Sequence, residues 1–263
     1  MQKENIEKIR AKKGFIIDMD GVLYHGNKLL PGVMEFIDWL KSDHKKFLFL
    51  TNSAARSPRE LKDKLSRMGI DVPEERLYTS ALATARFLAN QNPNGSAYVI
   101  GEPGLIRALY ESGYSMNDVN PDYVVVSETR DYNYDKIQHA INLVLKGARL
   151  IGTNPDVSGP VESGIAPATK ALIAPIEIAT GKKAYFIGKP NPLIVRHAVK
   201  SIDCHSAESV IIGDRMETDI ISGIESGIDT LLVLSGSTSI SDIEKFPYRP
   251  TFVLQSVYEI VKS

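Results

Sequence analysis

Four short polar blocks, widely separated along the chain, each follow a run of residues that is typical of a buried strand. The blocks are DMDGV (18–22), TNS (51–53), GKP (188–190) and GDRMETD (213–219), and the runs before them are FII, KFLFL, AYFI and SVII. In an open parallel sheet, ligands bind beyond the carboxyl ends of the strands. We therefore expect the four blocks to meet in space, although they are far apart in the sequence.

The segments between the blocks alternate between strand-like and helix-like patterns. Ser57, Pro58 and Glu60 add an N-cap, a proline at the first helical position and an acid at the third. Strands are predicted at 15–17, 47–50, 97–100, 123–126, 149–152, 184–187, 210–212, 230–234 and 252–254. Helices are predicted at 33–41, 58–68, 104–112, 135–146, within 167–180, at 192–201, at 218–225 and at the end of the chain. Such alternation indicates βαβ units and a parallel sheet.

The interval between the second and third blocks has room for a second core. It spans 54–188, and only the helix at 58–68 belongs near the first sheet. About a hundred residues remain, which is a common size for a domain, and they include three predicted strands. We predict an α/β protein with a Rossmann-like parallel-sheet core, residues 1–79 and 183–263, and an inserted smaller α/β cap domain, residues 80–182.

Composition excludes several classes of partner. Of the 263 residues, 43% are hydrophobic and 24% are charged, and the net charge is −1. We therefore expect no nucleic-acid partner and no polybasic membrane patch. Apolar runs reach about five residues, whereas a membrane helix needs roughly 20. Cys204 is the single cysteine and the N-terminal stretch is charged throughout, so we expect a cytoplasmic protein without an intramolecular disulfide.

The acids at the strand ends suit a hard cation and phosphoryl chemistry. Mg²⁺ takes oxygen ligands, and Asp18 and Asp214 can each supply one, with Asp219 acting from the same loop or from the surrounding layer. Asp18 is a candidate nucleophile that attacks phosphorus to form an acyl-phosphate. Asp20 is a candidate acid that protonates the leaving alkoxide and then activates water.

Each block taken alone also has an ordinary interpretation. DMDGV is compatible with a strand-to-turn junction, Thr51 and Asn52 are common turn residues, and a lone Lys189 is most often on the surface. His25 is interpreted as a loop residue, and the other histidines lack the spacing of a zinc site. It is the occurrence of all four blocks, in this order and each after a strand, that favours a catalytic site.

The four blocks, in this order, resemble the four signatures of the haloacid dehalogenase superfamily of aspartate-nucleophile phosphatases. The long insertion resembles the cap of its NagD-like and p-nitrophenylphosphatase-like members. Leu30-Pro31-Gly32 and Thr153-Asn154-Pro155-Asp156 also resemble that subfamily. The similarity extends from Gly14 to about Leu254, which is nearly the whole chain.

The resemblance implies a role for each block. Asp18 would be the nucleophile and a Mg²⁺ ligand, and Asp20 would be the acid/base and would offer its backbone carbonyl to the metal. Ser53 stands where relatives often carry an asparagine. The implied catalytic residues are Asp18, Asp20, Thr51 and Lys189, the implied phosphate-binding residues are Asp20, Thr51, Asn52, Lys189, Arg215 and Thr218, and the implied metal-site residues are Asp18, Asp20, Asp214 and Asp219.

We therefore expect a Mg²⁺-dependent phosphatase that hydrolyses small phosphomonoesters, of the nucleotide or sugar phosphate class, through an aspartyl-phosphate at Asp18. The cap would close over the site and exclude bulk water. A phosphotransferase or mutase would share the first half-reaction. A receiver-type signalling module gathers similar groups, but such modules lack an inserted cap, and an idle metabolite binder is the third alternative. Edge strands of the cap could pair two chains into a homodimer.

Overall fold

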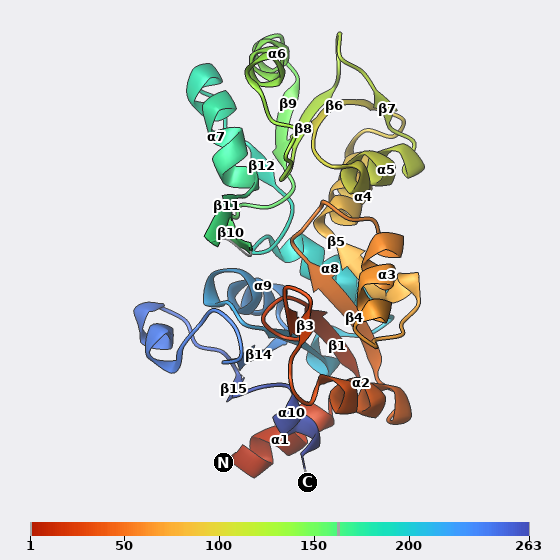
Figure 1. Ribbon diagram of the computed structural model, residues 1–263, viewed down its shortest axis with the longest axis vertical. Coiled ribbons are helices and arrows are strands. Elements are labelled where there is room, and N and C mark those ends of the chain that lie inside the picture. The colour runs from red at the N-terminus through yellow and green to blue at the C-terminus, as the bar shows by residue number, and fades with distance from the viewer. Residues whose placement is uncertain (1, 162–163, 263) are drawn as a thin grey trace. The chain divides into compact units, whose positions relative to one another are not determined.

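The computed structural model describes residues 2–161 and 164–262, and its contacts divide the chain into two units. The first unit comprises Met1–Thr51, Leu61–Tyr78 and Lys189–Ser263, and the second comprises Asn52–Glu60 and Thr79–Gly188. Each unit has its own sheet (Figure 1). The prediction that residues 80–182 form a separate cap domain stays a prediction.

The strands of the first sheet run parallel, so their carboxyl ends lie next to one another on the same side of the sheet. Its strand order is β15-β14-β13-β1-β4-β5, and β1 pairs in parallel with β13 and with β4. Ile17 lies opposite Ile212 and Phe49, and Asp18 lies opposite Leu50. The strands are β1 (Gly14–Asp18), β4 (Lys46–Thr51), β5 (Leu77–Thr79), β13 (Ser209–Gly213), β14 (Asp229–Val233) and β15 (Phe252–Leu254).

Helices cover both faces of this sheet. Phe15 and Ile17 share a buried cluster with Phe36 of α2 and Ile260 of α10. The opposite face carries Ile211, which α9 approaches so closely that a Cβ added to Gly223 would lie 2.5 Å from it. The helices are α1 (Gln2–Arg10), α2 (Val33–Ser42), α3 (Pro58–Arg67), α8 (Pro192–Ser201), α9 (Ile221–Ser226) and α10 (Tyr258–Val261). Burial on both faces explains why the strands are nearly continuous apolar runs.

The second unit contains a separate sheet in the order β12-β9-β8-β6-β7, and all its pairs are parallel. Its strands are β6 (Ser96–Ile100), β7 (Ser115–Met116), β8 (Tyr123–Val126), β9 (Arg149–Gly152) and β12 (Tyr185–Phe186). The helices are α4 (Ser80–Gln91), α5 (Pro103–Glu111), α6 (Tyr134–Leu145) and α7 (Thr169–Thr180), and Figure 1 shows α6 and α7 on one side of the sheet and α4 and α5 on the other. The predicted α/β core with a second, inserted α/β sheet is confirmed as the fold class.

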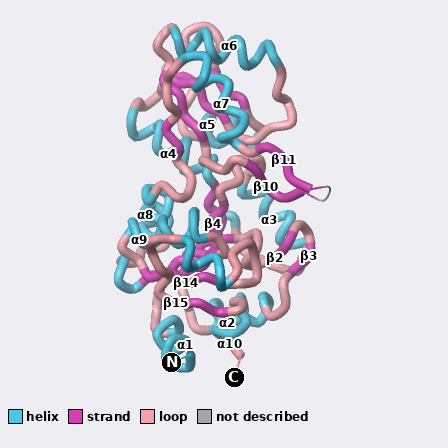
Figure 2. Tube along the Cα trace, turned by 90° about the vertical axis from the view of Figure 1, so that its left-hand side faces the viewer, coloured by secondary structure: helices cyan, strands magenta, loops and turns pink. Residues whose placement is uncertain are grey.

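Two short antiparallel hairpins leave these sheets (Figure 2). One joins β2 (Tyr24–His25) to β3 (Lys28–Leu29) directly after the first polar block, and the other joins β10 (Ser158–Val161) to β11 (Gly164–Pro167). Neither hairpin was predicted from the sequence. None of the helices in the described part of the chain has the length and apolar content that a membrane span requires.

One strand lies in a different sheet from the one we expected. The strand predicted at 184–187, before Lys189, was expected to belong to the same sheet as the strands that precede the other three blocks. The structure places it as β12, which pairs with β9 of the second sheet. The expectation that all four blocks follow strands of one sheet is therefore wrong for GKP. The strand composition of AYFI cannot indicate which sheet the strand joins, because both sheets accept parallel edge strands.

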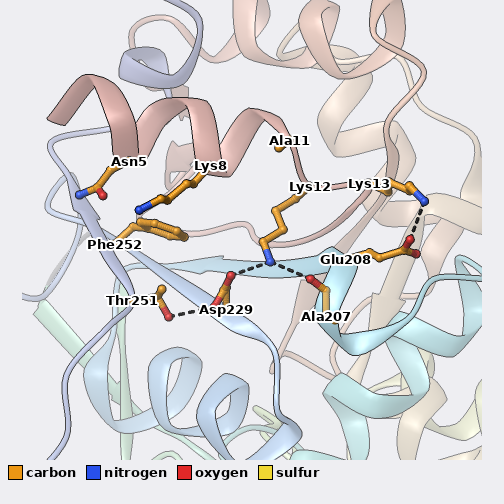
Figure 3. Close-up of a pocket in the computed structure, with 10 residues that line it drawn as sticks. All are labelled: Asn5, Lys8, Ala11, Lys12, Lys13, Ala207, Glu208, Asp229, Thr251 and Phe252. Atoms are coloured by element: carbon orange, nitrogen blue, oxygen red, sulfur yellow. Dashed lines mark hydrogen bonds and ion pairs between the residues drawn. The ribbon is translucent and has the colours of Figure 1, made fainter. Parts of the chain in front are cut away.

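A groove of about 640 Å³ lies at the amino-terminal ends of the strands of the first sheet, where β13 and β14 begin (Figure 3). Lys12 Nζ contacts Asp229 Oδ2 at 2.6 Å and the carbonyl oxygen of Ala207 at 2.8 Å. Lys13 Nζ contacts Glu208 Oε1 at 2.5 Å. These pairs tie the residues after α1 to the starts of the strands.

Candidate active site

Three of the predicted residues lie at strand ends of the first sheet. Asp18 ends β1, Thr51 ends β4, and Asp214 directly follows β13. Because Asp18 lies opposite Leu50 in the register, Thr51 is one residue beyond it on the neighbouring strand. The carboxyl edge of the sheet therefore gathers the first, second and fourth blocks, as parallel strands of matched length require.

Lys189 connects two of the acids in the interior of the first unit. Its Nζ donates to Asp18 Oδ1 at 2.7 Å and to Asp219 Oδ1 at 2.5 Å. The Lys189 side chain is 3% exposed, that of Asp18 is 13% exposed and that of Asp219 is fully buried. Burial lowers the pKa of Lys189, but the two carboxylates raise it more strongly, so the net pKa is raised. The two acids therefore favour the charged form of this lysine.

Asp219 is held by the turn that carries it. Residues Met216–Ile220 form a π-helical turn before α9, a geometry that is frequent at functional sites. Asp219 Oδ2 accepts from the Arg215 backbone N–H at 3.2 Å and from Thr218 Oγ1 at 3.3 Å. Both oxygens of Asp219 therefore have donors within the protein, and the hydroxyl of Thr218 is directed at this carboxylate.

Asp214 lies in a narrow site between two loops. It is 2% exposed, and its Oδ2 accepts from the Ser237 backbone N–H at 2.7 Å. A Cβ added to Gly21 or Gly236 would lie 2.5 Å or 2.1 Å from that oxygen, so both positions require the absence of a side chain. Sequence reasoning missed Ser237 and Gly236, since the SGS motif after β14 has the composition of an ordinary turn.

Three carboxylates form a group that fits a divalent cation. Asp18, Asp214 and Asp219 each offer an oxygen, and these oxygens lie within 4.8 Å of one another. The three acids and Lys189 together carry a formal charge of −2 in a buried place. Burial raises the pKa of Asp18 to about 8 and also raises that of Asp214, and in both cases the charge of Asp219 adds to the effect. A cation in this group would offset that unfavourable charge.

Asp20 differs from these acids in its exposure. Its side chain is 55% exposed, and its Oδ1 is 3.7 Å from His25 Nδ1. His25 belongs to the β2–β3 hairpin, and its Nε2 is 2.9 Å from the carbonyl oxygen of Ser235. Asp20 is thus accessible to a substrate oxygen. The turn that follows it is fixed by the backbone N–H of Gly21, which donates to the carbonyl oxygen of Tyr24 at 2.9 Å.

Asn52, the neighbour of Thr51 in the chain, contacts three residues of the second unit. Its backbone carbonyl accepts from Asn154 Nδ2 at 2.8 Å and from Ser80 Oγ. Its own Nδ2 donates to Asp156 Oδ2 at 3.0 Å. Asn154 and Asp156 belong to the TNPD motif, so this motif binds the turn that follows Thr51.

Comparisons with known proteins agree on one family. The model of the haloacid dehalogenase-like hydrolases matches residues 15–115, and a second model for hydrolases of this type matches residues 186–260. The chain is 47% identical to a dihydroxyacetone phosphatase from Corynebacterium glutamicum, over 94% of this chain and 90% of the relative. It is 44% identical to the ribonucleotide monophosphatase NagD from Escherichia coli, over 94% and 98%.

Solved structures give the same result for the fold. The structure of NagD from Escherichia coli superposes with a TM-score of 0.90, covering 95% of this chain and 98% of that one. A 4-nitrophenylphosphatase from Thermotoga maritima, 33% identical, superposes with a TM-score of 0.93, covering 97% and 98%. The two-sheet architecture is therefore shared along nearly the full length of these chains.

Proposed function

The chain belongs to the haloacid dehalogenase superfamily of phosphatases, in its NagD and p-nitrophenylphosphatase subfamily, and we propose that it hydrolyses small phosphomonoesters through an aspartyl-phosphate on Asp18. The observation that carries this proposal is the buried group in which Lys189 holds Asp18 beside Asp214 and Asp219. A carboxylate oriented by a lysine at a strand end is suited to nucleophilic attack on phosphorus.

In the first half-reaction, the Asp18 carboxylate forms a bond to phosphorus and the bond from phosphorus to the leaving oxygen breaks. Lys189 binds Asp18 Oδ1, so we assign the attack to Oδ2. Asp20 gives its proton to the leaving alkoxide, for which its exposed position is suitable. Thr51, the Asn52 backbone N–H, Arg215 and Thr218 are the groups proposed to surround the phosphoryl oxygens.

In the second half-reaction, Asp20 takes a proton from water, and the water oxygen bonds to phosphorus. The bond between phosphorus and Asp18 breaks, which returns the carboxylate and releases inorganic phosphate. The same aspartate therefore acts first as an acid and then as a base, and its protonation is reset within one turnover. Lys189 remains bound to Asp18 and Asp219 through both steps.

The metal proposed for this site is Mg²⁺. Asp18, Asp214 and the Asp20 backbone carbonyl would hold it, and Asp219 would support it, because both Asp219 oxygens already accept hydrogen bonds. When bound, the ion supplies positive charge that offsets the charges of the carboxylates and of the phosphate.

The proposed substrate is a small molecule of the sugar phosphate or nucleotide class. This rests on the relatives, one of which acts on dihydroxyacetone phosphate and another on ribonucleotide monophosphates, as their names state. Residues 80–182 are proposed as the cap that selects the leaving group and excludes bulk water. Homodimerisation through the cap and a cytoplasmic location stay predictions. The two edge strands β7 and β12 have only two residues each, which limits strand pairing between chains.

Phosphate release from a panel of phosphomonoesters, measured with Mg²⁺ and with EDTA, tests the proposed function. We expect release that EDTA reduces to background and that excess Mg²⁺ restores, because the carboxylate group loses its counter-charge without the ion. The ranking of triose phosphates, hexose phosphates and nucleoside monophosphates then identifies the substrate class. Turnover that is insensitive to EDTA would contradict the metal, and phosphate transfer to an added alcohol in place of water would favour the phosphotransferase.

A further inference from the structure

Polar side chains converge on Glu128 at the carboxyl end of the second sheet. Glu128 lies two residues after β8, and its Oε1 accepts from Ser53 Oγ at 2.8 Å and from the Ala54 backbone N–H at 2.7 Å. Its Oε2 accepts from Asn154 Nδ2 at 3.3 Å and from Thr169 Oγ1 at 3.2 Å. One carboxylate therefore joins three segments of the second unit that are distant in the sequence.

The turn that Glu128 holds begins with the residue proposed to bind phosphate. This turn consists of residues 52–54, which follow Thr51 directly. Asn154 Nδ2 links it to Glu128 a second time, because it donates both to the Asn52 carbonyl and to Glu128 Oε2. Asp156 binds the Asn52 side chain. The turn belongs to the second unit, and other residues of the same unit bind each of its residues through the backbone, the side chain or both.

We propose that Glu128 is a positioning residue for phosphate binding. By fixing Ser53 and Ala54, it sets the conformation of the turn that presents the Asn52 N–H to a phosphoryl oxygen. This inference rests on the proposed function, because it requires the Asn52 N–H to bind phosphate. Glu128 itself acts on the turn and takes no part in bond formation at phosphorus.

The chemistry of the donors explains why a carboxylate is present. An ionised carboxylate only accepts, and it has room for about four hydrogen bonds, which is the number that Glu128 makes. A glutamine keeps one acceptor oxygen, which can face Ser53 and Ala54, and its NH₂ can donate to Thr169 Oγ1. Only the contact with Asn154 Nδ2 is lost, and this group keeps the Asn52 carbonyl as an acceptor. A leucine has a similar size but offers no acceptor, so the Ala54 N–H would lose its partner.

The test compares Glu128→Leu and Glu128→Gln with wild type and with a control, Asp122→Leu. Asp122 directly precedes β8, at the other end of that strand, and its Oδ2 also accepts from one backbone N–H and one hydroxyl, both of Ser96, at 2.7 and 2.9 Å. The measurements are kcat, KM, the inhibition constant of inorganic phosphate and the melting temperature.

For Glu128→Leu we expect kcat/KM to fall by about 10–100-fold, the usual effect of losing a residue that orients a binding group. We expect the inhibition constant of phosphate to rise in this variant, because the turn at residues 52–54 is no longer held in its binding conformation in the free enzyme. For Glu128→Gln, we expect kcat/KM and the inhibition constant of phosphate to stay within a few-fold of the wild-type values. Asp122→Leu lowers the melting temperature but keeps the wild-type kcat/KM and phosphate affinity.

Wild-type phosphate affinity and kcat/KM in Glu128→Leu would overturn the proposal, as would an equal loss in Asp122→Leu. If Glu128→Leu does not fold, the smaller Glu128→Ala, which also lacks an acceptor, is combined with Ser53→Ala in a double-mutant cycle, and strictly additive effects on phosphate affinity would overturn the proposal. A wild-type protein that releases no phosphate contradicts the proposed function, whereas an active wild type with an unaffected Glu128→Leu variant contradicts only the role of Glu128.

Discussion

Replacing Asp18 with asparagine removes catalysis without removing the fold: we expect kcat to fall by about 10⁴-fold or more, as for other enzymes that lose their nucleophile. Asparagine has the shape of aspartate, and its amide oxygen can still accept the hydrogen bond from Lys189. It lacks the negative charge needed to attack phosphorus. Steady-state phosphate release with the best ester of the panel measures the loss.

The same variant should be as stable as wild type in EDTA, or more stable. Burial and the charges of Asp219 and Asp214 disfavour the ionised form of Asp18 and raise its pKa to about 8. Without a cation, this acid therefore destabilises the folded state at neutral pH, and a neutral asparagine removes that effect. Asp203→Asn is the matched control, because the Asp203 side chain is fully exposed and its ion pair lies on the surface. Retained turnover in Asp18→Asn, with unchanged activity in the control, would contradict the nucleophile assignment.

The second large effect is expected for Lys189→Met. This change removes the buried ammonium group that contacts Asp18 and Asp219 and leaves an apolar side chain of similar length. Loss of one partner of a buried ion pair typically costs about 3–5 kcal/mol, because the other charge stays buried. We also expect a fall in kcat on the order of 10³-fold, since the nucleophile is no longer oriented and the developing charge is less stabilised.

Chemical unfolding and kcat, measured on the same preparation, test this prediction. Lys13→Met is the control. The distance between Lys13 Nζ and Glu208 Oε1 is 2.5 Å, equal to that between Lys189 Nζ and Asp219 Oδ1, but the Lys13 side chain is 69% exposed. Exposed pairs contribute little, so the control should keep both stability and activity. A Lys189→Met variant as stable and active as this control would show that the buried lysine has neither role.

Much of the fold could be predicted because local patterns agreed with the final structure. Strand β8 has the predicted bounds, Tyr123–Val126, and the apolar runs of β1 and β4 are extended by one or two residues only. The helix after Ser57 begins with the expected reciprocal contacts, since the Ser57 N–H donates to Glu60 Oε2 at 2.8 Å and the Glu60 N–H donates to Ser57 Oγ at 3.3 Å. Such features depend on residues that are close in the sequence.

The remainder depends on contacts that no local pattern encodes. Helix α4 was not predicted, because its sequence SALATARFLANQ is rich in small residues and its apolar stripe is weak. The sheet that β12 joins is decided by pairing with β9. Glu128 gave no signal at all, since its four partners come from residues 53–54, 154 and 169, and only the folded chain brings them together.

The covalent intermediate on Asp18 is the central claim, and trapping it in an Asp20→Asn variant tests it most directly. With p-nitrophenyl phosphate the leaving group needs little protonation, so the first half-reaction proceeds, but the second lacks its base. We predict a burst of one p-nitrophenolate per site and, after acid quenching and digestion, a phosphoryl group on the peptide that contains Asp18. A variant that shows neither burst nor label, or a label on any other residue, would contradict the mechanism.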